Sequence, residues 1–215
     1  MAQLFPKQAN YLALILAVAG PLGGTLAIAG VWYYGSPKYL DVGYRPHQPV
    51  PYSHALHVGE LGLDCRYCHA TVETSSTATV PPTQTCMNCH RLVLKDSPLL
   101  APIRDSVALG RPMRWIRVHN LPDYVYFNHA VHVRAGVGCA SCHGKIHEMP
   151  EVMQVEPLSM SWCLDCHRNP TPHLRPREAI TDMDWWPPAN QAEVAAAIVR
   201  DKKLAPPSDC SGCHR

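Results

Sequence analysis

One short motif accounts for every cysteine in this chain: all ten belong to the string C-x-x-C-H, which occurs five times. Two thiols on one turn can form thioether bonds with the two vinyl groups of a haem, and the adjacent histidine then faces the iron. We therefore expect five covalently bound haem c groups. The strings are Cys65-Arg66-Tyr67-Cys68-His69, Cys86-Met87-Asn88-Cys89-His90, Cys139-Ala140-Ser141-Cys142-His143, Cys163-Leu164-Asp165-Cys166-His167 and Cys210-Ser211-Gly212-Cys213-His214.

Other uses of a C-x-x-C pair fit this pattern poorly. Four-cysteine zinc sites take such pairs two at a time, so five pairs leave one over. A redox dithiol needs no histidine after it. Because 13 of the 215 residues are histidine, a histidine after all five pairs by chance has a probability on the order of one in a million. Covalent haem attachment takes place outside the cytoplasm, so the strings are expected there.

The composition is not that of an ordinary hydrophobic core. The chain has only 2 Phe against 21 Pro, so bound porphyrins would supply most of the buried apolar surface. We predict a multihaem cytochrome c fold, mostly coil, with short α-helices wrapped around five haems and one N-terminal transmembrane helix. The formal net charge is +2 without a basic cluster, which argues against nucleic-acid binding.

Residues 11–34 contain no charged side chain and are long enough to cross a membrane as a helix. Ala27-Ile28-Ala29 before Gly30 resembles a signal-peptidase site, which leaves cleavage as the alternative. The length of the apolar run exceeds that of a signal-peptide core and favours a retained anchor.

The orientation of the anchor follows from the haem strings. Lys7 lies before the helix and Lys38 and Arg45 after it, so the positive-inside rule is indecisive. Extracytoplasmic haem attachment places residues 1–10 in the cytoplasm and residues 35–215 outside. The span has no ionisable side chain, so quinol or proton chemistry within the membrane would belong to partner subunits.

Beyond the anchor the chain repeats one module. Tyr52-Ser53-His54-Ala55-Leu56-His57-Val58 precedes two strings in residues 52–90, and Phe127-Asn128-His129-Ala130-Val131-His132-Val133 precedes two more in residues 126–167. Such self-similarity indicates a duplicated unit. The fifth string stands alone in residues 168–215.

Each H-x-x-H pair is expected to supply sixth ligands to iron, because imidazoles three positions apart on a helical turn diverge toward different haems. That set, His54, His57, His129 and His132, leaves one haem unassigned. His119 is the first candidate for it, and Met149 or Met160 could supply a thioether instead. The remaining histidines, His47, His147 and His173, are not expected to be ligands.

The segment after the fourth string contains one further predicted helix. Asn190 and Glu193 resemble a capping box that opens a helix from Gln191 to about Lys203. Pro206-Pro207 would stop it.

The aromatic-x-H-x-x-H element followed by closely spaced strings resembles the class III multihaem cytochromes c. Nearly the whole chain resembles a narrower family, the membrane-anchored pentahaem subunit of alternative complex III, a bacterial quinol:electron-acceptor oxidoreductase. The segments that carry this resemblance are 61–69 (LGLDCRYCH), 115–123 (WIRVHNLPD) and 160–168 (MSWCLDCHR).

The resemblance implies a redox subunit of a respiratory complex in the bacterial inner membrane, with the haem domain in the periplasm and no substrate site of its own. It implies an iron–sulfur subunit and polytopic quinol-binding subunits as neighbours. A monohaem cytochrome c, a soluble carrier or a terminal oxidase would lie downstream. It also implies a haem with His/Met ligation, for which Met149 and Met160 are the candidates here.

Two other functions compete with this interpretation. A membrane-anchored tetrahaem-type quinol dehydrogenase also has one helix and a small multihaem domain, but the fifth string favours the relay subunit. A pentahaem nitrite reductase would need an open iron site and usually a C-x-x-C-K string, which the sequence lacks. Such analogies rest on motifs alone.

Overall fold

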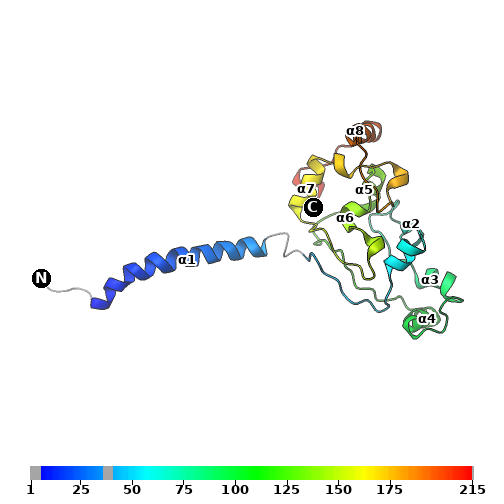
Figure 1. Cartoon of the computed structure of the whole chain (residues 1–215), viewed down its shortest axis with the longest axis horizontal. Coiled ribbons are helices and arrows are strands. Elements are labelled where there is room, and N and C mark those ends of the chain that lie inside the picture. Colours follow the sequence, from blue (N-terminus) through cyan, green and yellow to red (C-terminus); the bar gives the residue numbers. More distant parts are fainter. Residues whose placement is uncertain (1–5, 36–40, 215) are drawn as a thin grey trace. The chain divides into compact units, whose positions relative to one another are not determined.

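The computed structural model describes residues 6–35 and 41–214, and it divides into two units at residue 40. The first unit is a long helix and the second is the domain that carries the strings (Figure 1). The domain was predicted to begin at residue 35, and the second unit begins at Asp41. Residues 1–5 of the predicted cytoplasmic segment and Lys38 lie outside the described residues.

The first unit contains the predicted apolar helix. A 3-10 turn, η1 (Lys7–Ala9), leads into α1 (Asn10–Tyr34), which includes Pro21. Within the described part of the chain, the stretch Lys7–Tyr34 is the one helix long and apolar enough to cross a membrane, with a mean hydropathy of 2.1 over an 18-residue window. Its side chains are exposed, as a lipid-facing anchor requires.

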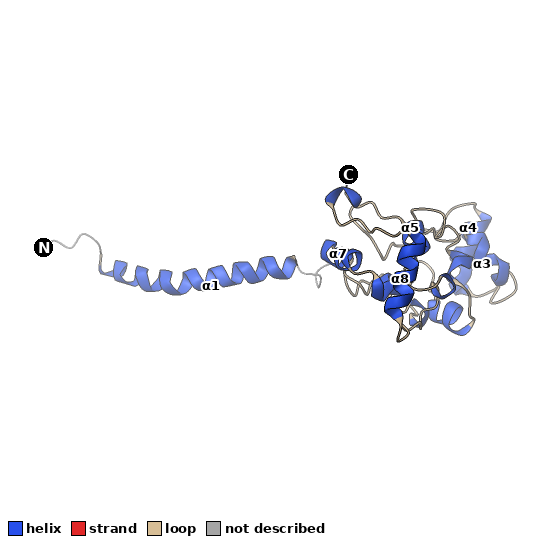
Figure 2. Cartoon of the chain, turned by 90° about the horizontal axis from the view of Figure 1, so that it is seen from above, coloured by secondary structure: helices blue, strands red, loops and turns tan. Residues whose placement is uncertain are grey.

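The second unit is built from short helices joined by long loops (Figure 2). Its described residues contain two isolated β-bridges, Val125 with His214 and Val137 with Leu174. The helices are η3 (Ala55–Glu60), α2 (Cys65–Cys68), α3 (Thr83–His90), η4 (Pro98–Leu100), α4 (Ala101–Ala108), α5 (His129–Ala135), α6 (Ala140–His143), η5 (Ile146–Glu148), α7 (Met160–Arg168), η6 (Thr171–His173), η7 (Arg177–Ala179), α8 (Gln191–Lys202) and η8 (Cys210–Gly212).

The protein part of the domain buries few apolar side chains. This agrees with the predicted helical, coil-rich fold, in which a polypeptide of this size needs apolar groups other than its own side chains to fill its interior. The buried apolar residues of the described chain are Val50, Ile103, Ala130, Val133, Leu174, Ile180, Met183 and Ala195.

The two predicted modules are held together by matched backbone hydrogen bonds. The amide of Ala55 in the first module donates to the carbonyl of Met149 in the second at 3.0 Å. The amide of Ala130 in the second module donates to the carbonyl of Ser75 in the first at 3.1 Å. Each H-x-x-H turn therefore lies against the loop that follows the first string of the other module.

Helix α8 matches the predicted helix, but its predicted capping box is wrong. The Asn190 side chain makes no capping hydrogen bond, and its backbone is not in the extended conformation that a capping side chain needs. Gln191 instead anchors the start of the helix by donating to the carbonyls of Thr171 and Leu174, at 2.6 and 2.7 Å. The helix ends at Lys202, and Lys203 after it adopts a left-handed conformation, three positions before the two prolines.

A buried arginine packs against the third string. The Arg175 guanidinium donates to the carbonyl of Asp182 at 2.9 Å and lies over the Trp185 ring, 4.5 Å from its centroid. Gly138, the residue before Cys139, sits directly against this guanidinium, so that no side chain fits at position 138.

We expect Gly138→Ala to destabilise the domain by about 1–3 kcal/mol, because the new methyl group would collide with the buried Arg175 guanidinium. The thermal unfolding midpoint of the haem-loaded chain measures this. The control is Gly23→Ala in α1, where a Cβ meets nothing within 4 Å. Equal midpoints for Gly138→Ala and the wild type would contradict the packing described.

Candidate haem-binding sites

Every string lies on or beside a short helical turn, which presents its two thiols and its histidine together. Two strings are preceded by an aspartate that caps the turn: Asp64 accepts from the Arg66 amide at 2.8 Å, and Asp209 from the Gly212 amide at 3.1 Å. Neither cap was predicted, although an aspartate directly before the first cysteine is visible in both strings.

Asp64 also ties the first string to a distant loop. The Arg66 side chain donates to both carboxylate oxygens, at 2.8 and 2.9 Å, and Thr181 donates to one of them at 2.9 Å. The hydrogen bond from the Arg66 side chain is the main reason why the pKa of Asp64 falls to about 2. Asp64 is therefore ionised in all but strongly acidic solution.

Most of the predicted ligand histidines share one hydrogen bond. Their Nδ1 atoms bond to a backbone carbonyl, so the Nδ1–H tautomer is fixed and Nε2 points away from the main chain, as in histidines that bind a metal. These pairs are His57 with Ser53, His69 with Thr79, His90 with Val93, His129 with Ser76, His132 with Asn128, His167 with Pro207 and His214 with Tyr124.

Three pairs of rings have the separation that an iron between them requires. Two imidazoles bound to opposite sides of one metal would have centroids roughly 6 Å apart, because each metal–nitrogen bond is about 2 Å long and each ring adds roughly 1 Å. The observed separations are 6.2 Å for His57 and His90, 6.1 Å for His132 and His167, and 6.5 Å for His129 and His143.

Around the first and third strings there are more candidate sixth ligands than irons for them to bind. Burial lowers the pKa of His54 to about 4, and the nearby His69 contributes to this shift. His119 lies against His143 at 4.4 Å, which leaves no room for an iron between these two rings, and its buried Nε2 has no hydrogen-bond partner. His119 thus faces the third string, together with His129, and its role as a ligand stays a prediction.

Burial keeps these imidazoles neutral, which is the state that binds iron. Loss of hydration is the largest cause of the lowered pKa of His143, to about 3, and it also lowers the pKa of His119 and His132. Neighbouring imidazoles lower these values further.

The aromatic residue that opens each module holds its two histidines in the same way. The ring of Tyr52 stacks on His57 at 4.4 Å and meets His54 edge-on at 4.8 Å. Phe127 stacks on His132 at 4.4 Å and meets His129 edge-on at 4.7 Å. The duplication predicted from the sequence is therefore repeated in three dimensions.

Cysteine contacts place the five strings in one row. The thiols of Cys65 and Cys139 are hydrogen-bonded to each other, so the first and third strings meet. The other links are electrostatic: in each of them a cysteine of one string raises the pKa of a cysteine in another. Cys68 and Cys86 join the first and second, Cys142 and Cys166 the third and fourth, and Cys163 and Cys213 the fourth and fifth.

The row therefore runs second, first, third, fourth, fifth. Figure 1 shows the same succession of elements, with α3 at one end of the domain, α6 near its middle, and α7 with the C-terminus at the other end. Haem c, when bound, supplies one-electron redox chemistry at each string.

His214 of the fifth string has no histidine ring against it among the described residues; its nearest ring is Tyr124, at 5.8 Å. Met160 begins α7 one turn before Cys163, so both side chains lie on one face of that helix. Since Cys163 lies near Cys213, this face turns toward the fifth string. Met149 lies elsewhere, against η3.

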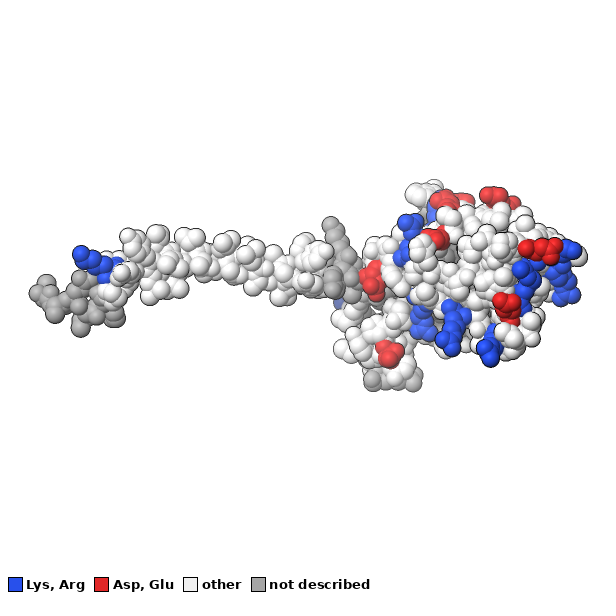
Figure 3. All heavy atoms as spheres, turned by 90° about the horizontal axis from the view of Figure 1, so that it is seen from below, with Lys and Arg blue, Asp and Glu red and all other residues white. Residues whose placement is uncertain are grey.

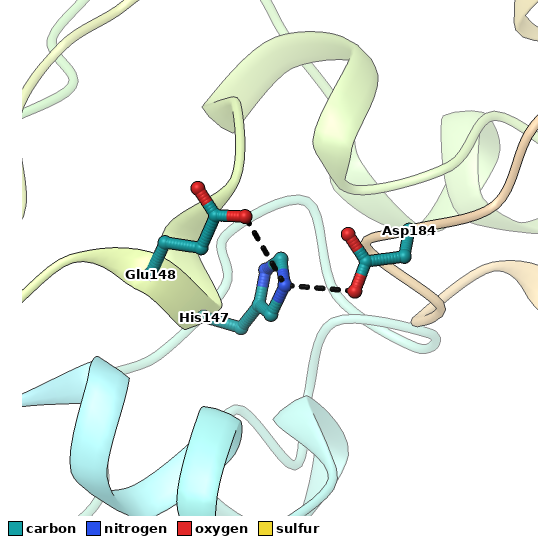
Figure 4. Close-up of side chains that lie close together, drawn as sticks. All are labelled: His147, Glu148 and Asp184. Carbon is teal, nitrogen blue, oxygen red and sulfur yellow. Dashed lines mark hydrogen bonds and ion pairs between the residues drawn. The ribbon is translucent and has the colours of Figure 1, made fainter.

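A separate cluster of His147, Glu148 and Asp184 has the residue types of a metal site (Figure 4). His147 Nε2 lies 3.0 Å from Asp184 and 3.8 Å from Glu148. The ammonium of Lys145, however, lies 2.7 Å from Asp184 and 3.3 Å from Glu148. This lysine already supplies the positive charge, so the cluster is an ion-pair network. His47 likewise pairs with a carboxylate, that of Glu151.

The repeated strings, the aimed imidazoles and the helical, coil-rich fold define a multihaem cytochrome c that binds haem c covalently. Residues 125–215 match the family of cytochrome c7 and related cytochromes c. The chain is also 37% identical over 117 residues to the multihaem cytochrome c subunit of a menaquinone reductase from Nitratidesulfovibrio vulgaris. That match covers 54% of this chain and about half of the relative, 53%.

If His57 is the sixth ligand opposite His90, His57→Ala should leave one iron high-spin and able to bind carbon monoxide. The other haems should stay low-spin, because their ligands are untouched. Carbon monoxide difference spectra and electron paramagnetic resonance of the purified chain measure this. His173→Ala is the control and should bind no carbon monoxide. A fully low-spin spectrum for His57→Ala would remove His57 from the ligand set.

We expect Met160→Leu to lower the highest midpoint potential, on the order of 0.1 V, because a thioether ligand favours ferrous iron. Met149→Leu should leave the redox titration unchanged. The charge-transfer absorption between sulfur and iron should disappear only with Met160→Leu. The reverse result would assign the ligand to Met149, and no effect of either variant would leave the fifth haem to a histidine.

Proposed function

We propose that this chain is the membrane-anchored electron-relay subunit of a respiratory quinol or quinone oxidoreductase, with five haems of type c. Residues 35–215 would lie on the periplasmic side of the bacterial inner membrane and residues 1–10 in the cytoplasm. The observation that carries this proposal is the unbroken row of strings, because an electron that enters at either end meets a neighbouring string at each step.

The residues around the row are suited to electron transfer rather than to the conversion of a substrate. The paired imidazoles would hold a haem iron between them, and an iron with two such ligands would exchange an electron with little rearrangement. Backbone carbonyls hold the rings of His57 and His132 in place. Burial lowers the pKa of His132 and of His143, which favours the neutral imidazole. We therefore propose that quinone chemistry belongs to partner subunits, an iron–sulfur protein and polytopic membrane subunits.

Two directions of flow are compatible with such a row. The resemblance to alternative complex III supports electrons that leave a quinol and pass to a monohaem cytochrome c, a soluble carrier or a terminal oxidase. The relative from N. vulgaris is described as part of a menaquinone reductase, which supports the opposite direction. In both cases the chain performs the same relay, and the partners decide the direction.

A tetrahaem-type quinol dehydrogenase remains the alternative function. The fifth string extends the row past the fourth, and His214 is anchored to the Tyr124 carbonyl as His69, His90 and His167 are anchored to theirs. These contacts favour a relay in which the C-terminal string is a working member.

The test removes single strings from the intact complex. Cys139→Ala with Cys142→Ala deletes the third string and should stop electrons from passing between the ends of the row. The same change at Cys86 and Cys89 removes the end string and leaves the first, third, fourth and fifth strings in succession. It is the matched control, because electrons should still pass between the first and fifth strings. Reduction of the remaining haems by a quinol, and oxidation by an external acceptor, are followed by stopped-flow absorption.

Mass spectrometry should show five haem adducts in the wild type and four in each deletion variant. Transfer at the wild-type rate without the third string would contradict the proposed order, and four or fewer adducts in the wild type would contradict the count.

A further inference from the structure

The second string, at one end of the row, is followed by a turn that exposes large apolar side chains. Leu92, Val93, Leu94 and Leu99, which we call the leucine corner, are 80, 57, 63 and 62% exposed. The Nδ1 atom of His90 bonds to the Val93 carbonyl at 3.0 Å. The turn therefore lies behind this ring, on the side opposite to the Nε2 atom that faces iron.

This turn is held rigidly. The amides of Leu92 and Val93 donate to the Cys89 carbonyl, and the guanidinium of Arg104 donates to the carbonyls of Lys95 and Ser97, at 2.8 and 3.0 Å. Leu94 has a φ of +52°, a conformation that a bulky side chain avoids, and its side chain gains no burial there. A fixed apolar surface of this kind is typical of an interaction site.

The surroundings of the leucine corner are positively charged. Residues 91–114 contain five Lys or Arg and two Asp, a formal charge of +3, whereas the whole chain carries +2 and the rest of it therefore −1. Within the described residues, Arg91, Arg104 and Arg111 have no carboxylate within ion-pair distance, and Lys95 reaches only the neighbouring Asp96. Figure 3 shows Lys and Arg side chains along one side of the domain and at its far end, with Asp and Glu side chains interspersed.

We propose that the leucine corner and its arginines form the docking surface for an acidic electron-transfer protein, which exchanges one electron with the haem of the second string. The apolar centre would be covered on binding, and the basic rim would steer a negatively charged partner. This proposal rests on the relay function proposed above and assigns one end of the row to a partner of stated charge.

The test follows reduction of the purified full chain in detergent by a reduced plant-type [2Fe–2S] ferredoxin, a small acidic donor. One electron leaves the ferredoxin cluster and reduces one ferric haem. We expect the second-order rate to fall about tenfold between low and physiological ionic strength. Leu92→Glu and Arg91→Glu should each lower the low-salt rate about tenfold.

Matched variants separate docking from general effects. Leu61→Glu makes the same change at a side chain that is 63% exposed, and Arg200→Glu reverses a charge on α8. Both should keep the wild-type rate with ferredoxin. Reduction by methyl viologen radical, which needs no protein docking, should be equal in all variants. Wild-type rates with ferredoxin in Leu92→Glu and Arg91→Glu, or no salt dependence, would overturn the proposal.

Two further outcomes are distinguishable. If anionic phosphatidylglycerol nanodiscs, compared with phosphatidylcholine discs, protect Leu92→Cys from a water-soluble maleimide, the corner is a lipid contact and the docking proposal is wrong. If methyl viologen fails to reduce all five haems, or the haem count is below five, the relay function itself fails, whatever ferredoxin does.

Discussion

The hydrogen bond from imidazole Nδ1 to a main-chain carbonyl is the interaction on which the rest of this domain depends. It converts a freely rotating side chain into a ring whose Nε2 points in one direction. Because seven histidines are fixed in this way, the backbone of short turns and loops becomes the scaffold of the cofactors. Few side chains are buried in an apolar core, and few are needed if each ring holds a haem, because the haems would then fill the interior.

The sequence predicted the parts that depend on local chemistry. The five strings, the apolar helix and the paired H-x-x-H elements follow from spacing alone, and the structure brings His57 to His90 and His132 to His167. The sequence could not predict that Cys65 meets Cys139, because these residues lie 74 positions apart and meet only through the packing of the two modules. The capping box at Asn190 was wrong because Gln191 found carbonyl partners in a neighbouring loop, a tertiary contact that overrides the local pattern.

The candidates that the sequence left open separate in space. Met160 lies on the face of α7 that turns toward the fifth string, and Met149 lies against η3. His119 competes with His129 at the third string rather than standing near His214. Ligand choice in such a domain is therefore decided by which loops meet, and loops are the part of a chain for which periodicity carries least information.

The matched hydrogen bonds between the modules have a consequence for how the domain arose. Cys65 and Cys139 occupy equivalent positions in the two modules and are hydrogen-bonded to each other. Ala55 is equivalent to Ala130, and Ser75 to Met149. The amide of Ala55 donates to Met149, and the amide of Ala130 donates to Ser75. Reciprocal contacts between equivalent residues are the mark of an isologous, two-fold interface. The modules are thus joined head to head, as in a homodimer whose two copies have been fused into one polypeptide. The two-fold contacts themselves give the pair of modules no polarity. Any directional bias must come from what is added at the ends of the row, the segment after the second string at one end and the C-terminal string at the other.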